Sequence, residues 1–350
     1  MKMHKNVRIS LKKLSLPTPI KKYFSSQNWD MDLGSNTNPF GGDFSNYPDV
    51  MQLDLKKLYL KRILSLNPPP TFEVVVDENN VLFTAGSMEG IDLLLRAFPD
   101  PNQDLVCIPT PTFSAYAHWS IINELRVKKI PLLGKNLDQV DIESIIKLNP
   151  KLLFICNPNN PVGTLISHAT LKKLCQSLSG FIIIDEAYIE FSDQHSSLFY
   201  LNEYPNLIIL RTFSKGWGLA GVRCGAIIAH KTIIDTLRYI QYPFSVSIPS
   251  QQAVREILTA PEKVFETWKK IEKMRRSLYS ELSQKRNVIK VFESQTNFLM
   301  LALHNFEEVM RNLKQEKIHV LDCSSELLQS IRVSIGTEEQ NQKFLEIISG

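Results

Sequence analysis

Short, uniformly apolar runs alternate with stretches of helical periodicity through the first two thirds of the chain. Three of these runs are residues 152–156, residues 181–185, which end in an acid, and residues 207–210. Strands that are buried on both faces are apolar along their whole length, whereas strands with one wet face alternate. Apolar strands separated by helices predict a mostly parallel sheet with helices on both faces. The sequence therefore favours an α/β fold whose ligands lie at the carboxyl ends of the strands.

The same alternation continues on either side of these runs. Further strands are expected at residues 81–84, 104–109 and 226–229, and helices at residues 88–98, 114–122 and 167–178. After residue 243 a long amphipathic helix is expected over about residues 262–286, followed by a smaller set of strands and helices. We therefore predict an N-terminal segment over residues 1–35, a large domain over residues 36–245 and a small C-terminal domain over residues 246–350.

Composition narrows the partners that the chain can have. Its 350 residues suffice for more than one typical domain, and 40 basic against 36 acidic residues leave a net charge of +4. That balance does not favour a nucleic acid partner. No apolar run reaches the length of a membrane span or of a secretory signal. Five cysteines without a C-x-x-C pair indicate reduced thiols, so we expect a cytoplasmic protein.

One lysine stands in a glycine-rich stretch between two apolar runs. Lys215 follows the run 207–210 and precedes the run 226–229. Burial and nearby positive charge lower the pKa of a lysine, so that enough neutral amine exists near pH 7 to attack an aldehyde. Arg223 can supply that charge and can also hold a phosphate. Pyridoxal phosphate is the cofactor that needs both an aldehyde-binding lysine and a phosphate anchor.

The glycines of this stretch also allow another interpretation. Residues 216–221 match the pattern G-x-G-x-x-G of dinucleotide-binding turns. In those turns the pattern opens a helix, and an acidic residue follows at a characteristic spacing. Here an apolar strand follows instead, without an acidic residue at that spacing, so we discount a dinucleotide site. A single lysine in a turn is usually solvated, and the case for Lys215 therefore depends on residues elsewhere.

Polar residues follow two of the predicted strands. Asp185 ends the strand 181–185, and Tyr188 comes three residues later. A buried carboxylate at that point can keep a pyridine nitrogen protonated, although an acid after a strand is also a common helix cap. Asn160 lies in a proline-stiffened loop after the strand 152–156, where its amide can donate to a phenolic oxygen or belong to an ordinary turn. Both places are at the expected ligand edge of the sheet.

Two further loops have a composition that suits a cofactor. Ser87, Met88 and Glu89 lie between the strand 81–84 and a helix, where free N–H groups and the helix dipole suit a phosphate. Phe113 follows another strand and can place a ring on the cofactor face, although a core position is more common for a phenylalanine. Each of these patterns is weak alone, and their weight comes from their combination.

Together these residues resemble the fold-type I, pyridoxal-phosphate-dependent aminotransferases of class I and II, and most closely the histidinol-phosphate aminotransferases. The matching blocks are residues 34–41, 47–49, 86–90, 111–116, 157–163, 185–188, 211–225, 296–298 and 331–336. They occur in the family's order over most of the chain. The resemblance implies a large domain with a mostly parallel seven-stranded sheet covered by helices, and a smaller C-terminal α/β domain.

The resemblance also assigns roles at matching positions. It implies that Lys215 links the cofactor and then moves a proton during catalysis, with Asp185 and Tyr188 as catalytic companions. Asp185 would pair with the pyridine nitrogen, Asn160 and Tyr188 with the ring oxygen. Phe113 would stack on the ring, at a position where the family more often has tyrosine. The residues implied for the phosphate are Ser87, Met88, Glu89, Ser214 and Arg223.

Substrate and subunit contacts are implied as well. Arg332 matches the family's anchor for a carboxylate or phosphate, and Asn36 and Asn160 match further substrate contacts. Tyr47 is expected to reach the phosphate of the cofactor in a neighbouring subunit, which implies a homodimer. Segment 1–35 is expected to pack on the small domain or on that partner.

One departure bears on the substrate. Leu321 stands where the family usually has an arginine that contacts the substrate phosphate, and a charged hydrogen bond of that kind is worth about 1.5–3 kcal/mol. The implied reaction is amino transfer between histidinol phosphate and 2-oxoglutarate, a step of histidine biosynthesis. An aminotransferase for aromatic or other amino acids and a lyase like threonine-phosphate decarboxylase stay open.

Two non-enzymatic alternatives are less compatible with the sequence. A regulatory cofactor-binding module of a transcription factor would need a DNA-binding domain in front, and about 30 residues precede the first matching block. A relative without cofactor would have no need to keep Lys215, Asp185, Tyr188 and Arg223 together. We therefore expect an enzyme.

Overall fold

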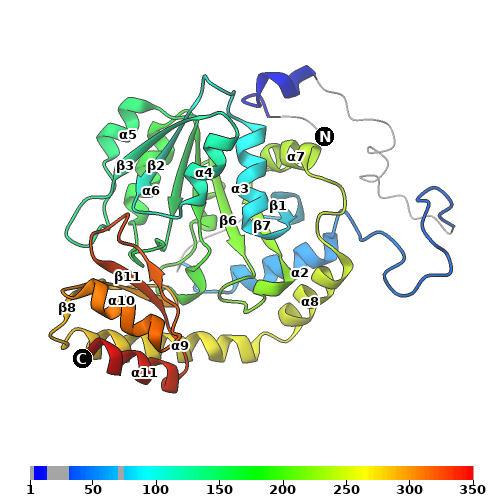
Figure 1. Ribbon diagram of the computed structural model, residues 1–350. Coiled ribbons are helices and arrows are strands. Elements are labelled where there is room, and N and C mark those ends of the chain that lie inside the picture. Colours follow the sequence, from blue (N-terminus) through cyan, green and yellow to red (C-terminus); the bar gives the residue numbers. More distant parts are fainter. Residues whose placement is uncertain (1–3, 14–30, 70–74, 350) are drawn as a thin grey trace.

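A seven-stranded sheet lies at the centre of the computed structural model, which describes residues 4–13, 31–69 and 75–349 (Figure 1). Its strands are β1 (Val81–Thr84), β2 (Leu105–Thr110), β3 (Arg126–Pro131), β4 (Leu152–Cys156), β5 (Phe181–Asp185), β6 (Leu207–Thr212) and β7 (Gly225–Ala229). They are ordered β1-β7-β6-β5-β4-β2-β3, and β7 alone runs in the opposite direction to the other six. The predicted mostly parallel, seven-stranded sheet is confirmed.

Burial explains which strands could be predicted from the sequence. Every residue of β1, β4, β5, β6 and β7 is buried, as expected for strands covered on both faces. The strand β3 lies at the edge of the sheet and carries Arg126, Lys128 and Lys129, which are charged residues that discourage pairing with another chain. Its polar sequence lacks the apolar run on which our strand predictions rested, and β3 was therefore missed.

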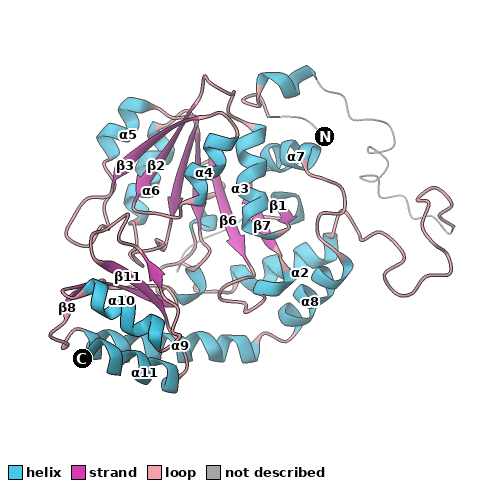
Figure 2. Cartoon of the chain, in the orientation of Figure 1, coloured by secondary structure: helices cyan, strands magenta, loops and turns pink. Residues whose placement is uncertain are grey.

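Helices cover both faces of this sheet (Figure 2). The helices α3 (Gly86–Ala97), α4 (Ala115–Ile122) and α7 (Lys231–Ile240) share one core with it. On the opposite face, α2 (Leu53–Leu64), α5 (Ile142–Leu148), α6 (His168–Ser177) and α8 (Ile248–Thr259) share a second core. Because apolar side chains fill both faces of the sheet, polar groups are expected mainly at the ends of its strands.

A smaller sheet of four antiparallel strands lies beside the large one. Its strands are β8 (Val288–Val291), β9 (Phe298–Leu303), β10 (Leu321–Asp322) and β11 (Ser330–Ser334), in the order β10-β11-β9-β8. The helices that belong to it are α9 (Glu262–Leu282), α10 (Phe306–Gln315) and α11 (Glu338–Ser349). Because Trp268 of α9 belongs to the large core and Leu278 to the small one, this helix joins the two sheets. A domain boundary at residue 245 stays a prediction.

The N-terminal residues are described in part. His4 N–H donates to Thr236 Oγ1 over 2.7 Å, and Arg8 N–H donates to the Ala97 carbonyl over 2.8 Å, so residues 4–13 contact α7 and α3. Residues 14–30 lie outside the described chain, and the expected packing of segment 1–35 on the small domain or a partner stays a prediction. Residues 31–52 form an arm that leaves the body of the molecule (Figure 1) and rejoins it near Asp49, whose carbonyl accepts a hydrogen bond from Gln251.

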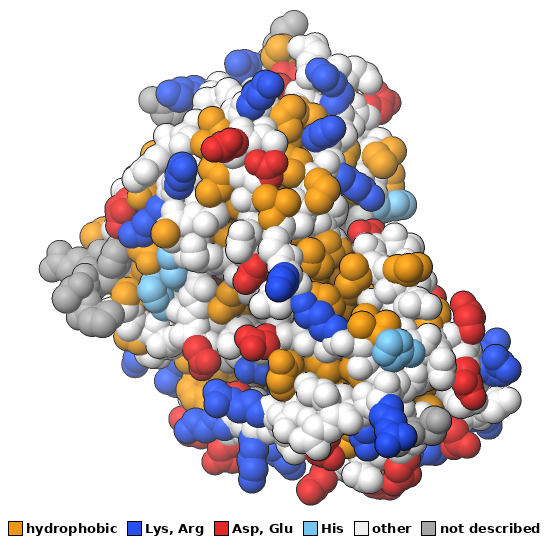
Figure 3. Space-filling model, turned by 90° about the vertical axis from the view of Figure 1, so that its left-hand side faces the viewer, with side chains coloured by type: hydrophobic (Ala, Val, Ile, Leu, Met, Phe, Trp, Pro, Cys, Tyr) orange, Lys and Arg blue, Asp and Glu red, His pale blue; other side chains and the backbone are white. Residues whose placement is uncertain are grey.

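The surface and the helices bear on which other partners the protein can have. On the face drawn in Figure 3, basic and acidic side chains are interspersed among hydrophobic and uncharged ones. None of the described helices combines the length and apolar character needed to cross a membrane. Within the described residues, no three His, Cys, Asp or Glu side chains are grouped so that they could hold a metal ion.

The start of β7 lies directly against the start of α3. A Cβ atom on Gly225 would lie 2.5 Å from the Ser87 nitrogen and 2.6 Å from the Gly86 carbonyl carbon. Those are backbone atoms, which cannot move aside as the end of a long side chain can. Glycine at position 225 therefore lets the N-terminus of α3 reach the carboxyl edge of the sheet.

We predict that Gly225→Ala destabilises the folded protein by about 1–3 kcal/mol, the usual cost of forcing a methyl group into filled space. Urea unfolding measures the difference. Gly221→Ala is the matched control, because nothing lies within 4 Å of a Cβ at that exposed position, and we expect a change within about 0.5 kcal/mol. Equal effects of the two substitutions would contradict the backbone contact.

Candidate active site

A cavity of about 500 Å³ opens at the carboxyl ends of the parallel strands, between the two sheets. The predicted residues that line it are Ser87, Met88, Phe113, Asn160, Asp185, Tyr188, Ser214, Lys215, Arg223 and Arg332. Leu321 lines it too. The segments that carry these side chains follow β1, β2, β4, β5 and β6, or belong to the small sheet. The large sheet thus brings residues from distant parts of the sequence to one place, as its topology predicts.

Lys215 lies in the loop between the antiparallel strands β6 and β7. The Phe213 N–H donates to the Cys224 carbonyl over 3.0 Å, and the Gly218 N–H donates to the Lys215 carbonyl over 3.0 Å, which closes the loop. Burial lowers the pKa of Lys215, and the positive charges of Arg332 and Arg223 add to this. The amine therefore has a larger neutral, nucleophilic fraction than a solvated lysine.

Asp185 is buried at the end of β5. Burial raises the pKa of Asp185 to about 6, although the Tyr116 hydroxyl and the Ala187 N–H donate to the carboxylate and oppose this shift. The hydroxyl of Tyr116 donates to Oδ2 over 2.7 Å. A carboxylate with so little solvation is stabilised by any cationic N–H donor that enters the cavity.

Tyr116 is a residue of the site to which our sequence analysis gave no role. It comes from α4, where its ring stacks on Phe154 with a centroid distance of 4.9 Å and meets Phe113 edge-on at 5.6 Å. A buried tyrosine in a helix is usually a core residue, so neither its type nor its spacing distinguished it. Its position within the matching block 111–116 was the available clue.

The N-terminus of α3 and Arg223 form one end of the cavity. The residue before α3 is Ala85, which has no side-chain oxygen to cap the first N–H groups of the helix. A Cβ on Gly86 would lie 2.6 Å from Arg223 Nη2, so the guanidinium occupies the space that a side chain would fill. Arg223 Nη1 also lies 3.4 Å from the Ser214 hydroxyl. Free helix N–H groups, a hydroxyl and a guanidinium together suit a phosphate group.

The carboxylate of Glu89 has a structural role. It accepts a hydrogen bond from the Ala85 N–H, at the beginning of its own helix, and burial raises the pKa of Glu89. Glu89 is not among the described residues that line the cavity. The phosphate contact that the family resemblance implies for its backbone N–H stays a prediction.

Arg332 stands at the other end of the cavity, on β11 of the small sheet. One of its terminal nitrogens donates to the Asn160 side-chain oxygen, and its guanidinium carbon lies 4.8 Å from the centre of the Phe298 ring. Its Nε is buried without a hydrogen-bond partner among the described residues. An anionic group that entered the cavity would satisfy this guanidinium.

Leu321 is the cross-strand neighbour of Arg332. The two residues are paired in the antiparallel register of β10 and β11, and both line the cavity. Side chains on directly opposite residues of such a pair lie close together. Asp322 and Glu326 line the same side of the cavity. The surroundings of Arg332 on the small sheet are therefore apolar and acidic.

Two predicted residues, Tyr47 and Asn36, lie on the arm formed by residues 31–52. Tyr47 is 55% exposed, and its ring stacks on Phe244 with a centroid distance of 4.3 Å. Asn36 is exposed as well. Neither is among the described residues that line the cavity of this chain. Their predicted contacts with cofactor and substrate stay predictions.

The groups around the cavity fit a phosphorylated aldehyde with a basic ring. Its phosphate would be held by the start of α3, Ser214 and Arg223, and its ring nitrogen by Asp185. Lys215 would meet the aldehyde, and Arg332 remains for the anionic group of a substrate. These are the requirements of pyridoxal phosphate and an amino acid or its phosphorylated analogue.

Comparisons with known proteins agree on one family. The profile of the family described as aminotransferase class I and II matches residues 35–348. A histidinol-phosphate aminotransferase of Cytophaga hutchinsonii is 32% identical over 323 residues, which cover 90% of this chain and 90% of that protein.

Solved structures show the same fold. The histidinol-phosphate aminotransferase of Clostridium acetobutylicum matches with a TM-score of 0.77 at 25% identity, over 88% of this chain and 90% of that one. L-threonine-O-3-phosphate decarboxylase of Porphyromonas gingivalis matches with a TM-score of 0.73 at 22% identity, over 88% of this chain and 93% of that one. At that identity the second likeness concerns the fold alone.

The shifted pKa of Asp185 predicts a pH-dependent cost in stability. Because its folded-state pKa of about 6 lies above the ordinary 3.8, unfolding releases a proton between these values. Stability contributed by this group is thus lost as the pH rises from about 4 to about 6, by up to about 3 kcal/mol for a shift of about two units. Asp185→Asn should therefore make the cofactor-free protein more stable at pH 7 but not at pH 4.

Urea unfolding at the two pH values measures this difference. Asp322→Asn is the control, because Asp322 is an exposed carboxylate at the same cavity, so that its replacement removes a charge without relieving any burial. If Asp185→Asn changed stability equally at pH 4 and pH 7, Asp185 would not be the group that resists ionisation.

Proposed function

The chain belongs to the aminotransferase class I and II family, whose members use pyridoxal phosphate, and from that premise we propose that it transfers the amino group of histidinol phosphate to 2-oxoglutarate. The products would be imidazole-acetol phosphate and glutamate, as in histidine biosynthesis. The observation that carries this proposal is the presence of Arg332 in the same cavity as Lys215 and Asp185. The name shared by its curated relatives supports the choice of substrate.

Each residue of the cavity has a part in such a reaction. Bound pyridoxal phosphate supplies an aldehyde that accepts an amino group and a ring that delocalises the electrons left on the substrate carbon. Lys215 Nζ, whose pKa burial lowers, would take a proton from that carbon and deliver it to the carbon of the cofactor's aldehyde group. Asp185 keeps a ring nitrogen protonated, and the Tyr116 hydroxyl helps to keep Asp185 ionised. Arg332 orients the substrate through its anionic group.

The residues of the small sheet that line the cavity are expected to bind a substrate phosphate weakly. Arg332 can form a two-pronged contact with a phosphate or a carboxylate, but Leu321 beside it offers no hydrogen bond. The carboxylates of Asp322 and Glu326 line the same side. They oppose rather than attract a dianionic phosphate.

Leu321 also favours a second candidate function. An apolar side chain beside Arg332 suits an amino acid that offers a carboxylate to the guanidinium and an apolar or aromatic side chain to Leu321. Transamination of aromatic amino acids is therefore the alternative.

Kinetics with histidinol phosphate test the choice of substrate. We predict that wild-type protein accepts histidinol phosphate with a high KM, and that Leu321→Arg lowers this KM by about tenfold, equivalent to about 1.4 kcal/mol. Steady-state assays with 2-oxoglutarate as acceptor measure it. Leu328→Arg is the matched control, because it adds the same charge at an exposed position that is not among the described residues of the cavity wall, and it should leave the KM unchanged.

The results separate the two candidates. Leu321→Arg should do little for a non-phosphorylated amino acid, which offers only one anion for Arg332 to hold. If the wild type ignored histidinol phosphate but turned over phenylalanine or tyrosine, the alternative function would replace the first. If Leu321→Arg left histidinol phosphate kinetics unchanged, residue 321 would not face the substrate phosphate.

We further propose that the enzyme is a cytoplasmic homodimer. The arm 31–52 carries apolar side chains that are largely exposed in the single chain, with Leu33 at 87% and Phe40 at 94% exposure. A second copy of the chain would cover them and bring Tyr47 towards the partner's cofactor. All five cysteines are buried and unpaired, which suits a reducing compartment.

Subunit mixing tests the role of Tyr47. Lys215→Ala and Tyr47→Phe subunits, each nearly inactive alone, should regain about a quarter of the wild-type sites after exchange, because half of the dimers are mixed and each then has one intact site. Activity of the exchanged mixture measures the recovery. The control pairs Lys215→Ala with Arg223→Ala, which line the same cavity of one chain, and should recover nothing. No recovery in the first mixture would place Tyr47 outside the partner's site.

A further inference from the structure

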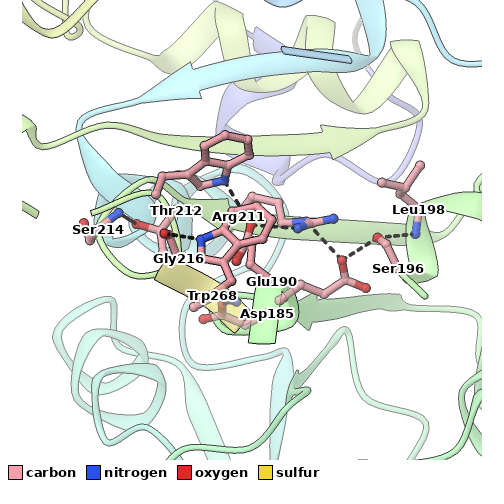
Figure 4. Close-up of polar contacts among 12 residues, drawn as sticks. Asp185, Glu190, Ser196, Leu198, Arg211, Thr212, Ser214, Gly216 and Trp268 are labelled. Carbon is pink, nitrogen blue, oxygen red and sulfur yellow. Dashed lines mark hydrogen bonds and ion pairs between the residues drawn. The ribbon is translucent and has the colours of Figure 1, made fainter. Parts of the chain in front are cut away.

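A cluster of buried polar side chains lies under the Lys215 loop (Figure 4). We define the Arg211 cluster as Arg211, Glu186, Glu190 and Trp217. Arg211 Nε lies 3.1 Å from Glu186 Oε2, and Arg211 Nη1 lies 3.1 Å from Glu190 Oε1. All three ionisable side chains are at most 3% exposed. None of the four is among the described residues that line the active cavity.

The two carboxylates of this cluster differ in how fully their oxygens are hydrogen-bonded. Glu186 also accepts from the Ser196 hydroxyl and the Ser197 N–H, over 2.5 and 2.6 Å. Glu190 accepts only from Arg211 and from the Trp217 indole N–H through Oε1, and Oε2 has no partner in the described part of the chain. Burial raises the pKa of Glu190. A buried carboxylate oxygen without a hydrogen-bond partner costs folding free energy, so the presence of Glu190 at this position requires an explanation.

The reason lies in the residues that follow Lys215. A Cβ on Gly216 would lie 2.7 Å from the Glu190 Cβ and 3.0 Å from its Oε2, so the loop backbone rests on the side chain of Glu190. The next residue, Trp217, donates its indole N–H to Glu190 Oε1 over 3.1 Å. Glu190 is thus in contact with both residues that follow the lysine.

A second tryptophan holds the same loop from α9. The indole N–H of Trp268 donates to the Gly216 carbonyl over 2.5 Å (Figure 4). Seven residues further along α9, Arg275 Nη1 donates to the carbonyls of Phe191 and Thr296, over 3.0 and 2.9 Å. The loop, the segment after β5 and the entrance to β9 are therefore tied to one helix.

Packing alone does not explain the contact between Trp268 and the loop. The ring of Trp268 meets Trp217 edge-on at 5.3 Å and Phe265 at 4.8 Å, and a phenylalanine could fill much of that space. What only the indole supplies is a donor for the carbonyl next to Lys215. A buried carbonyl without a donor costs free energy, so the hydrogen bond fixes the orientation of that peptide.

We propose that Trp268 and Glu190 are positioning residues that hold the peptides after Lys215, so that the place of the lysine amine in the cavity depends on α9. The helix also carries the core of the small sheet, which contains Arg332. The lysine that performs the proton transfer and the arginine that holds the substrate are thereby placed by the same element. The proposal depends on the cofactor chemistry of the family and is independent of which amino acid is the substrate.

Trp268→Phe removes the donor and keeps an aromatic ring. We expect kcat to fall by about fivefold to tenfold, the usual effect of one lost hydrogen bond, with the KM of the amino donor within about twofold. The absorbance of the bound cofactor should change with pH at a midpoint about half a unit or more higher, because a loosened loop lets water reach the charged form of the lysine linkage. Phe265→Leu is the control, since it alters packing on Trp268 without touching the hydrogen bond.

The absorbance titration of the holoenzyme decides the matter without an assay of turnover. If Trp268→Phe folds and its titration midpoint equals that of Phe265→Leu, the proposal is wrong. Should Trp268→Phe fail to fold, Trp217→Phe decides instead, because it keeps an aromatic ring but removes the indole N–H that joins the loop to Glu190. A shift to higher pH in Trp217→Phe would support the proposal, and an unchanged midpoint would refute it.

Discussion

Burial of the large sheet on both faces is the constraint on which the site depends. Since β4, β5 and β6 are buried at every residue, their polar side chains gather at or near the ends where the chain leaves the sheet. The carboxyl edge collects these exits, and there Asp185, Asn160 and Lys215 meet. Because β7 is antiparallel, its first residue lies at this same edge. There Gly225 allows Arg223 to lie next to the start of α3. The cofactor site thus follows from the strand order.

Low solvation in the cavity acts on two groups in opposite senses. Burial lowers the pKa of Lys215 and raises that of Asp185, so both groups are driven towards their neutral forms. A neutral amine is what nucleophilic attack requires, whereas an ionised Asp185 is what a protonated ring nitrogen requires. The Tyr116 hydroxyl resolves this conflict in part, because it donates to the carboxylate. Low solvation alone therefore favours the form of Lys215 that the reaction requires. Asp185 needs a hydrogen-bond donor in addition, because low solvation disfavours its ionised form.

The sequence predicted those parts of the molecule whose residues carry a local pattern. Apolar runs predicted the buried strands, and Asp185 at the end of such a run pointed to the cavity. The edge strand β3 was missed because its lysines break the pattern, and Tyr116 was missed because a tyrosine that bonds an active-site carboxylate has the same local sequence as a core tyrosine. Contacts such as that of Trp268 with Gly216 join residues far apart in the chain, and no local pattern encodes them.

The groups that we propose for the chemistry and for the choice of substrate lie on different sheets. Lys215, Asp185 and the groups proposed to bind the phosphate belong to the large sheet, whereas Arg332 and Leu321 are neighbours on two strands of the small one. A substitution at position 321 therefore changes what the substrate meets without moving the cofactor groups. Because β10 is a two-residue strand at the edge of its sheet, its side chains are constrained by few neighbours. Either leucine or arginine at that position is thus compatible with the fold, so the weaker hold on a phosphate that we propose would leave the cofactor groups in place.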